Sequence, residues 1–367
     1  MRNNISIIGI GKLGLCFSLT LEKSGYNVLG VDISEEYVNK INDKTFKSDE
    51  KNVEQLLLKS TNFKATTSLA AALNHSNNIF VFVATPSLKN GRYDHSSVDK
   101  LVQDLKNFGF QKNKKHLIIG CTTMPEYCDT VQDRLNKYNY EVSYNPEFIA
   151  QGTILKDQAN PDMVLIGQAS EEAGDILEEI YIKHTLNNPR IHRMTRTEAE
   201  ICKISLNCFL TTKIAYANMI GDIALSAKSR PEKILSAIGS DSRIGGKYLK
   251  YGFGYGGPCF PRDNRALAIF AKDKNSQALI SIASDDSNKL HLKNQVNHFC
   301  ENQKISEPVI FDSVTYKPES TMLEESQQLF FAVEIAKKGY NVTIREREEV
   351  IKQIKKNYGD LFKYELR

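Results

Sequence analysis

Short apolar runs alternate with longer amphipathic stretches through the first half of the chain. Each run has the length of a buried strand, and most end in a turn that contains proline or polar residues. The runs lie at 5–8, 28–31, 79–84, 116–120, 141–144 and 163–167. Alternation of such strands with helices predicts an α/β fold built on a parallel, doubly wound sheet.

A long helix is predicted where this alternation stops. Residues 196–228 contain no glycine or proline before Gly221. Apolar side chains recur there at roughly helical spacing, at Ile201, Ile204, Cys208, Ala215 and Met219. We expect a helix of this length, placed after a first domain, to link the domains and to form a dimer surface. Further helices are expected at 231–239, 263–272 and 276–300.

The last part of the chain predicts a second strand–helix–strand unit. Its strands are expected at 309–311 and 340–344, with a helix at 326–338 between them and a charged helix at 348–358 after them. A complete doubly wound half needs more strands, so we expect a short C-terminal domain.

The first strand runs into a glycine motif with three fixed positions, Gly9, Gly11 and Gly14. A helix-like segment and a second strand follow, and Asp32 stands at the end of that strand. In this context the glycines allow a tight turn and close approach of a pyrophosphate, and the carboxylate binds ribose hydroxyls. The motif predicts dinucleotide binding, and Asp32 favours NAD over NADP because it would repel a 2′-phosphate.

Three polar residues follow strands whose carboxyl ends meet at one edge of the sheet, where such folds bind ligands. They are Thr85, Thr123 and Glu147. Ordinary turn chemistry explains any one of them equally well. On the long helix, Lys203 and Asn207 share one face, and they either form a salt bridge or cap, or reach into a site.

The segment 252–263 carries the clearest chemical signal. Four glycines within 252–257 suit a loop that lets a ligand approach the backbone closely. Cys259 follows them, and Asp263 comes about one helical turn later. A thiol beside a carboxylate on such a loop suits covalent catalysis. The alternative is a tight turn beside a buried, inert cysteine.

Composition narrows the class of protein. The net charge of +4 is too small to favour nucleic acid or membrane binding, and the basic runs 112–115 and 352–356 are expected to be solvated faces. No apolar stretch approaches the ~20 residues of a membrane span, and the N-terminus lacks a secretory pattern. The seven cysteines are scattered, which favours reduced thiols in the cytoplasm and gives no disulfide framework or metal site.

Together these motifs resemble the UDP-glucose/GDP-mannose dehydrogenase family, collinearly over about residues 5–345. They comprise the glycine motif with Asp32 and the segments 84–86, 122–125, 145–148, 203–207, 243–245 and 252–263. The resemblance implies two Rossmann-like domains joined by a central helical segment that forms a homodimer. We therefore expect an NAD-binding domain at 1–190, a central domain at 191–302 and a short C-terminal nucleotide-sugar domain at 303–367.

The resemblance also implies a reaction, in which a sugar CH₂OH is oxidised to a carboxylate by two hydride transfers to NAD. Cys259 would be the nucleophile, through a thiohemiacetal and a thioester. Lys203 and Asn207 would stabilise oxyanions, Asp263 and Thr123 would orient water, and Glu147 would assist proton transfer. Nucleotide-sugar contacts would come from Phe148, Arg243, Tyr248, Phe253, Gly254, Gly256, Gly257 and Lys317. Arg243 matches a residue that in the family can come from the partner subunit.

Three departures from the family pattern bear on this expectation. Gln151 replaces a glutamate near the cofactor, Glu324 replaces an arginine that contacts NAD, and the C-terminal domain lacks its last strands.

The expected substrate is UDP-glucose, oxidised to UDP-glucuronate for surface polysaccharide. Segments 145–148 and 152–157 are also similar to those of GDP-mannose dehydrogenases, and N-acetylated UDP-sugars remain open. A non-catalytic nucleotide-sugar-binding paralogue and a single-step β-hydroxyacid dehydrogenase are the alternatives from other classes.

Overall fold

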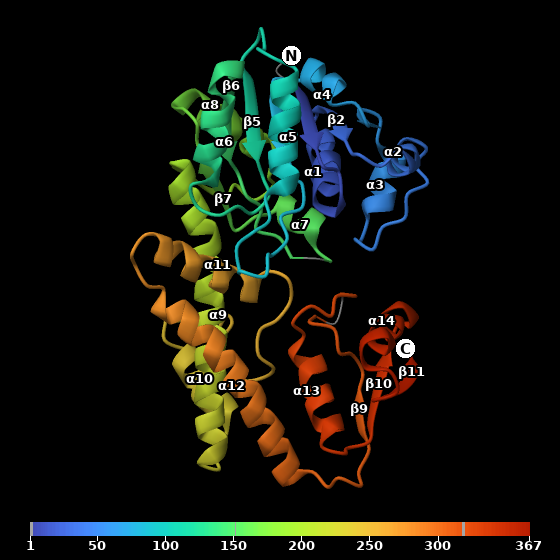
Figure 1. The fold of residues 1–367 in the computed structure, drawn as a ribbon, viewed down its shortest axis with the longest axis vertical. Helices are drawn as coiled ribbons and strands as arrows, with labels where there is room; N and C mark the ends of the chain where they lie inside the picture. The colour runs from blue at the N-terminus through green and yellow to red at the C-terminus, as the bar shows by residue number, and fades with distance from the viewer. Residues whose placement is uncertain (1–2, 151, 318–319) are drawn as a thin grey trace. The chain divides into compact units, whose positions relative to one another are not determined.

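The computed structural model describes residues 3–150, 152–317 and 320–367. The chain divides into two compact units, Met1–Lys203 and Ile204–Arg367. Figure 1 shows the elements of each unit along the chain. Gln151 lies outside the described residues, so its replacement of the family glutamate stays without structural description.

The described strands of the first unit form one eight-stranded sheet with the order β3-β2-β1-β4-β5-β6-β7-β8. They are β1 Asn4–Ile8, β2 Asn27–Val31, β3 Phe63–Thr66, β4 Asn78–Val81, β5 Lys115–Ile119, β6 Tyr140–Tyr144, β7 Met163–Gly167 and β8 Arg190–Met194. All neighbours pair in parallel except β6 and β7, which are antiparallel. The predicted α/β fold is confirmed, and the antiparallel pair is a departure from an all-parallel sheet.

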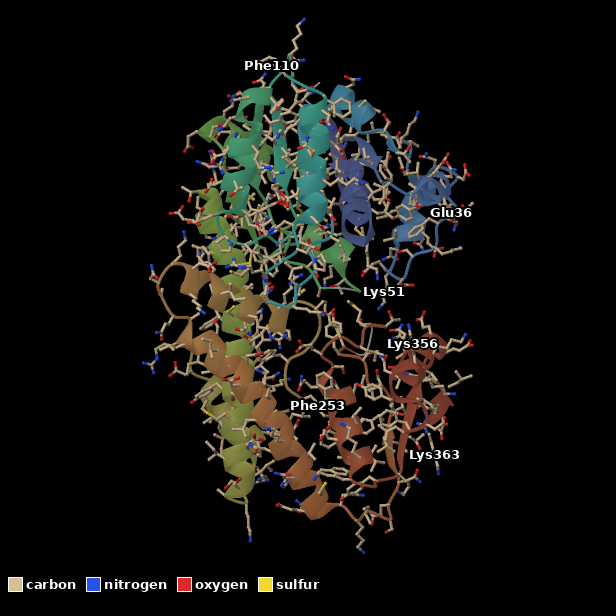
Figure 2. All side chains as sticks on the ribbon, viewed as in Figure 1. Glu36, Lys51, Phe110, Phe253, Lys356 and Lys363 are labelled. Atoms are coloured by element: carbon tan, nitrogen blue, oxygen red, sulfur yellow. The ribbon has the colours of Figure 1, made fainter. Side chains whose placement is uncertain are left out.

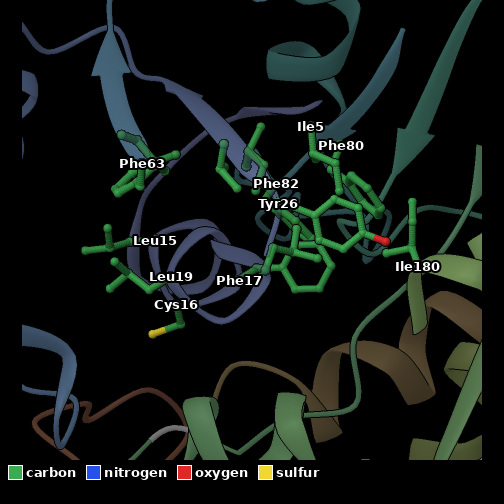
Figure 3. Packing of buried hydrophobic residues seen from close by; sticks show 14 of the residues in the cluster. Ile5, Leu15, Cys16, Phe17, Leu19, Tyr26, Phe63, Phe80, Phe82 and Ile180 are labelled. Atoms are coloured by element: carbon green, nitrogen blue, oxygen red, sulfur yellow. The ribbon is translucent and has the colours of Figure 1, made fainter. Parts of the chain in front are cut away.

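Helices connect these strands and give the sheet two separate cores. They are α1 Lys12–Lys23, α2 Glu35–Asn42, α3 Val53–Lys59, α4 Leu69–His75, α5 Ser96–Asn107, α6 Tyr127–Leu135, α7 Ile154–Ala159 and α8 Glu171–His184. Alternate residues of one strand enter opposite cores: Phe80 packs with the α1 residue Phe17, whereas Ile79 and Val81 pack in the other cluster. Figure 3 shows the first core around α1. Successive side chains of a strand point to opposite faces of the sheet, and each face has its own core. The central strands therefore carry apolar residues on both faces.

The second unit combines long helices with a three-stranded parallel sheet, in the order β11-β10-β9, among its described residues. Its helices are α9 Arg196–Ser226, which begins in the first unit, α10 Pro231–Gly239, α11 Phe260–Asp273, α12 Leu279–Asn302, α13 Gln327–Lys337 and α14 Glu348–Tyr358. Its strands are β9 Val309–Phe311, β10 Val342–Glu346 and β11 Lys363–Leu366. Strand β11 was not predicted, because three of its four residues are exposed and leave no apolar run.

One expectation about surface charge is wrong. Lys115, in the basic run 112–115, opens β5 and is buried, with 6% of its surface exposed. Its ammonium donates hydrogen bonds to the carbonyl of Ser76 and to Oδ1 of Asn77, which satisfy the charge away from water. Separately, no described helix has both the length and the apolar character that a membrane crossing requires.

Candidate active site

The glycine motif forms the turn between β1 and α1. Gly9 has a φ of +86°, and its N–H donates to the carbonyl of Val31 at 2.8 Å. Gly14 has no room for a side chain, because a Cβ there would lie 2.0 Å from the carbonyl oxygen of Gly9. Gly11, by contrast, caps α1 with open space around its missing Cβ. The protein's own packing therefore requires the first and third glycines, and the second leaves space at a helix N-terminus.

This helix N-terminus fits a dinucleotide phosphate. No side chain caps α1, and its first turn contains no acidic residue. The N–H groups at such an end attract anions. Asp32 follows β2, is half-buried, and accepts a hydrogen bond from the N–H of Ser34 at 3.1 Å. Its second carboxylate oxygen suits the ribose hydroxyls of NAD.

Thr85 and Thr123 lie where β4 and β5 end, and both are buried. The hydroxyl of Thr85 donates to the carbonyl of Thr122 at 2.8 Å, which joins the two loops. The hydroxyl of Thr123 donates to Oε1 of Glu200 at 2.8 Å. Because this bond uses its proton, the Thr123 hydroxyl can only accept any further hydrogen bond. Its expected role in orienting a water molecule stays a prediction.

Glu200 was not singled out from the sequence. Its buried carboxylate accepts hydrogen bonds from the hydroxyl of Thr123 and from the N–H groups of Glu126 and Cys128, at 2.7–2.9 Å. Burial raises its pKa to about 7 against the opposing effect of these bonds. One signal was available, because Glu200 precedes Lys203 by three residues and so lies on the same helix face.

Glu147 follows β6 and lies beside Tyr181 of α8. The Tyr181 hydroxyl is 2.7 Å from Oδ1 of Asn145 and 3.0 Å from Oε1 of Glu147. Desolvation raises the pKa of the Glu147 carboxyl to about 7, and the Tyr181 hydrogen bond and the charge of Lys203 act in the opposite direction. A carboxyl with this pKa can take or release a proton near neutrality.

Lys203 is held beside the same loop. Its ammonium donates to the backbone carbonyl of Glu147 at 2.7 Å and lies 4.2 Å from the ring centroid of Phe148. Only 8% of Lys203 is exposed. The first unit thus brings together Glu147, Phe148 and Lys203, three residues that the sequence analysis selected.

The second unit brings together Asn207, Asp263 and Cys259. The Asn207 amide donates to Oδ2 of Asp263 at 2.6 Å. Asp263 lies in the first turn of α11 and is 1% exposed, and its N–H donates to the carbonyl of Cys259 at 2.9 Å. Cys259 is the N-cap residue of α11 and is exposed, so the alternative of a buried cysteine is excluded. A helix N-terminus stabilises negative charge, as a thiolate nucleophile requires.

The glycines of the loop before Cys259 lie in close contact with other residues of the chain. A Cβ on Gly254 would lie 2.3 Å from Oδ1 of Asn288, and one on Gly256 would lie 2.2 Å from the carbonyl oxygen of Glu325. Gly257 has a φ of +81° and packs on the ring of Tyr316. The expectation that these glycines admit a ligand is thus incomplete, because internal packing already requires them. Phe253, which is labelled in Figure 2, packs edge-on against Phe331.

Two of the remaining predicted residues contact the loop segment: Tyr248 packs edge-on against Phe260, and the carbonyl of Glu324 accepts a hydrogen bond from the N–H of Gly257 at 3.0 Å. Arg243 is exposed and forms an ion pair with Asp241 at 2.7 Å. Tyr248 is 48% exposed and has a φ of +62°. Lys317 is half-buried, and its carbonyl accepts from the hydroxyl of Thr315. Glu324 is exposed, and its effect on NAD stays a prediction.

Comparison with known proteins gives matches to two family domains. Residues 3–185 match the NAD binding domain of the UDP-glucose/GDP-mannose dehydrogenase family, and residues 197–290 match its central domain. A UDP-glucose 6-dehydrogenase of Rickettsia bellii is 31% identical over 292 residues, which cover 78% of this chain and 67% of the relative.

Two further relatives match over nearly the whole chain. A GDP-mannose 6-dehydrogenase of Pseudomonas aeruginosa is 29% identical over 94% of this chain and 81% of its own length. The solved structure of a UDP-glucose dehydrogenase from the archaeon Pyrobaculum islandicum superimposes with a TM-score of 0.87 at 24% identity, and covers 99% of this chain and 85% of that one. This last likeness establishes the fold.

Proposed function

Because the chain belongs to the UDP-glucose/GDP-mannose dehydrogenase family, we propose that it is a UDP-glucose 6-dehydrogenase. The reaction would oxidise the CH₂OH group of the sugar to a carboxylate and give UDP-glucuronate. The observation that carries the proposal is the exposed thiol of Cys259 at the N-terminus of α11, one turn before the buried Asp263.

The cofactor is NAD, which when bound accepts the hydride that leaves the sugar in each oxidation. The first oxidation turns the alcohol into an aldehyde and releases a proton. The Cys259 thiolate then forms a C–S bond to the aldehyde carbon, and loss of a second hydride gives a thioester. Water cleaves that thioester to the carboxylate and returns the thiol. The aldehyde stays bound covalently between the two oxidations.

The other residues are assigned by their chemistry. Lys203 is a fixed positive charge, and with the Asn207 amide it would stabilise the oxygen anions that develop. Glu147 would take the proton that leaves the alcohol, because its pKa is about 7. Asp263 and Thr123 are assigned to orienting the hydrolytic water. Arg243, Tyr248, Lys317 and the loop 253–257 are assigned to the nucleotide sugar.

We also propose that the enzyme is a homodimer through α9. A row of large, exposed apolar side chains would be unusual on a helix that faces only water. Four of them recur along one face of α9, at Phe209, Tyr216, Met219 and Ile223, with exposed fractions of 43–66%. The seven cysteines are thiols, which supports a reducing compartment such as the cytoplasm.

A second candidate substrate is GDP-mannose, favoured by the GDP-mannose 6-dehydrogenase relative, which aligns over 94% of this chain. The test is NADH formation with UDP-glucose, GDP-mannose, UDP-GlcNAc and UDP-ManNAc in parallel, with NADP as the cofactor control. We expect the highest kcat/KM with UDP-glucose and NAD. A higher value with another sugar would transfer the substrate assignment to it, and no oxidation of any sugar would favour a non-catalytic paralogue.

A further inference from the structure

A buried histidine joins α12 to the start of the glycine-rich loop. His291 is 2% exposed. Its Nε2 lies 2.7 Å from the carbonyl oxygen of Gly252, and its Nδ1 lies 2.9 and 3.0 Å from the two carboxylate oxygens of Asp222 on α9. The sequence analysis did not select either residue.

The partners of the two ring nitrogens fix the protonation state of His291. A backbone carbonyl has no proton to donate, so Nε2 must carry one. Asp222 also accepts hydrogen bonds from the Asn294 amide at 2.8 Å and from the Tyr251 hydroxyl at 3.2 Å, which is the environment of an ionised carboxylate. Nδ1 must therefore donate as well. With both nitrogens protonated, the ring is an imidazolium in an ion pair with Asp222.

This ion pair holds one end of the loop that leads to Cys259. The carbonyl of Gly252 also accepts from the Gln295 amide at 3.1 Å, and its N–H donates to Oδ1 of Asn218 at 3.1 Å. Three residues later, the Asn288 amide pairs with both the N–H and the carbonyl of Tyr255, at 2.9 Å each. The loop backbone is thus fixed at Gly252 and at Tyr255 by side chains of α9 and α12.

We propose that His291, as an imidazolium paired with Asp222, is a positioning residue for the glycine-rich loop and makes nucleotide-sugar binding weaken as the pH rises. The identity of the ligand rests on the proposed function, whereas the effect on the loop does not. His291 touches no reacting atom in this account. It acts through the backbone of Gly252.

Loss of one proton would break the contact with the loop. The remaining proton would stay on Nδ1, because the carboxylate of Asp222 is a stronger acceptor than a carbonyl. The lone pair of Nε2 would then face the Gly252 carbonyl oxygen, and the two would repel. Tyr251 also faces this pair, and burial together with the charge of Asp222 raises its pKa, so it stays protonated over the same range. Glu232 of α10 acts on Tyr251 in the same direction.

The kinetic test compares His291→Gln with His298→Gln. His298 lies on the same helix but is exposed, so it controls for the substitution itself. Between about pH 5 and about pH 8, the range in which histidine side chains generally change charge, we expect the wild-type KM for the nucleotide sugar to rise about tenfold. We expect kcat to have the same pH profile in wild type, His298→Gln and His291→Gln, since His291 touches no reacting group. His298→Gln should follow wild type, and His291→Gln should lose the pH dependence of KM. A His291→Gln enzyme with the wild-type slope would overturn the proposal.

Two measurements that need no activity separate this proposal from the assigned reaction. Hydrogen exchange of Gly252 and Tyr255, corrected for intrinsic exchange, should speed up with pH in wild type and not in His291→Gln. The ring ¹⁵N shifts of His291 in the wild-type protein should show two protonated nitrogens at about pH 6. One unprotonated nitrogen there would overturn the proposal even if His291→Gln failed to fold. If the shifts and exchange agree but no nucleotide sugar is oxidised, the loop contact stands and the proposed function fails.

Discussion

At the scale of single residues, Glu147 and Glu200 share an unusual environment. Burial is the largest cause of the pKa of about 7 in both cases, and hydrogen bonds to each carboxylate act against it. Their surroundings differ in hydrogen bonding, exposure and nearby charge. Glu200 has three hydrogen-bond donors and no exposure, whereas Glu147 is half-buried and lies near the charge of Lys203. Glu147 is thus the better candidate for moving a proton, and Glu200 for holding the loop of Thr123.

Oxidation of an alcohol releases a proton, so the pH dependence tests the assignment of Glu147. A base acts only when ionised, and the ionised fraction of Glu147 rises as the pH rises through about 7. We expect kcat to rise through that range and to level off above it. Glu147→Gln should lower kcat by about 10²-fold or more and remove this limb of the profile. The control is Glu198→Gln, at an exposed position of α9. Persistence of the limb in Glu147→Gln would exclude Glu147 as the base.

The sequence predicted some site residues better than others. Glu147 and Thr123 were selected because they follow strands, and strand ends are recognisable in a sequence. Glu200 lies within a helix, and the group that it holds, Thr123, lies 77 residues earlier. His291 and Asp222 are 69 residues apart. Contacts of such long range depend on tertiary packing, so no local pattern reveals them.

At the scale of elements, α9 shows how far periodicity can predict a helix. The expected helix at 196–228 is confirmed as Arg196–Ser226. Of the apolar positions that defined it, Ile204, Cys208 and Ala215 are buried, but Met219 is 43% exposed. Met219 therefore belongs to the opposite, exposed face with Phe209, Tyr216 and Ile223. Periodicity predicted the helix, but a helix apolar on both sides does not indicate which side faces its own core.

The exposed face of α9 predicts the assembly of the protein. A charge in a dimer interface loses its hydration without gaining a partner, so Ile223→Glu should shift a dimer to monomer at micromolar concentration. Ile182→Glu is the matched control, because Ile182 of α8 is similarly exposed, at 63% against 58% for Ile223. Sedimentation velocity gives the readout. A wild-type protein that sediments as a monomer, or an Ile223→Glu variant that remains a dimer, would contradict this interface.

At the scale of the whole molecule, the sequence predicted the α/β class and most strands of the larger sheet. The strands missed were the short or polar ones, β3, β8 and β11. Strand β8 reads Arg-Ile-His-Arg-Met and has no fully buried residue, so it carries no apolar run. The antiparallel pairing of β6 with β7 was also missed, because strand direction depends on the path of the connecting chain.

The sequence predicted only part of the structure around the glycine-rich loop. Cys259 is exposed and Asp263 lies in the first turn of the following helix, as a reactive thiol beside a carboxylate requires, and their catalytic roles stay predictions. Internal packing gives a further reason for the glycines, and close approach of a ligand stays a prediction. Gly254 and Gly256 are required by close contact with Asn288 and Glu325, partners that lie far along the chain.

The central claim is that one thiol serves both oxidations, and the number of NADH molecules formed per nucleotide sugar consumed tests it most directly. We expect two NADH and one sugar acid for wild type and for Cys300→Ala, which removes a half-buried thiol outside the site. Cys259→Ala should fold, as judged by circular dichroism, and form no sugar acid, because the aldehyde has no sulfur to bind. A Cys259→Ala enzyme that forms two NADH per sugar and the acid at a rate near wild type would contradict the covalent mechanism.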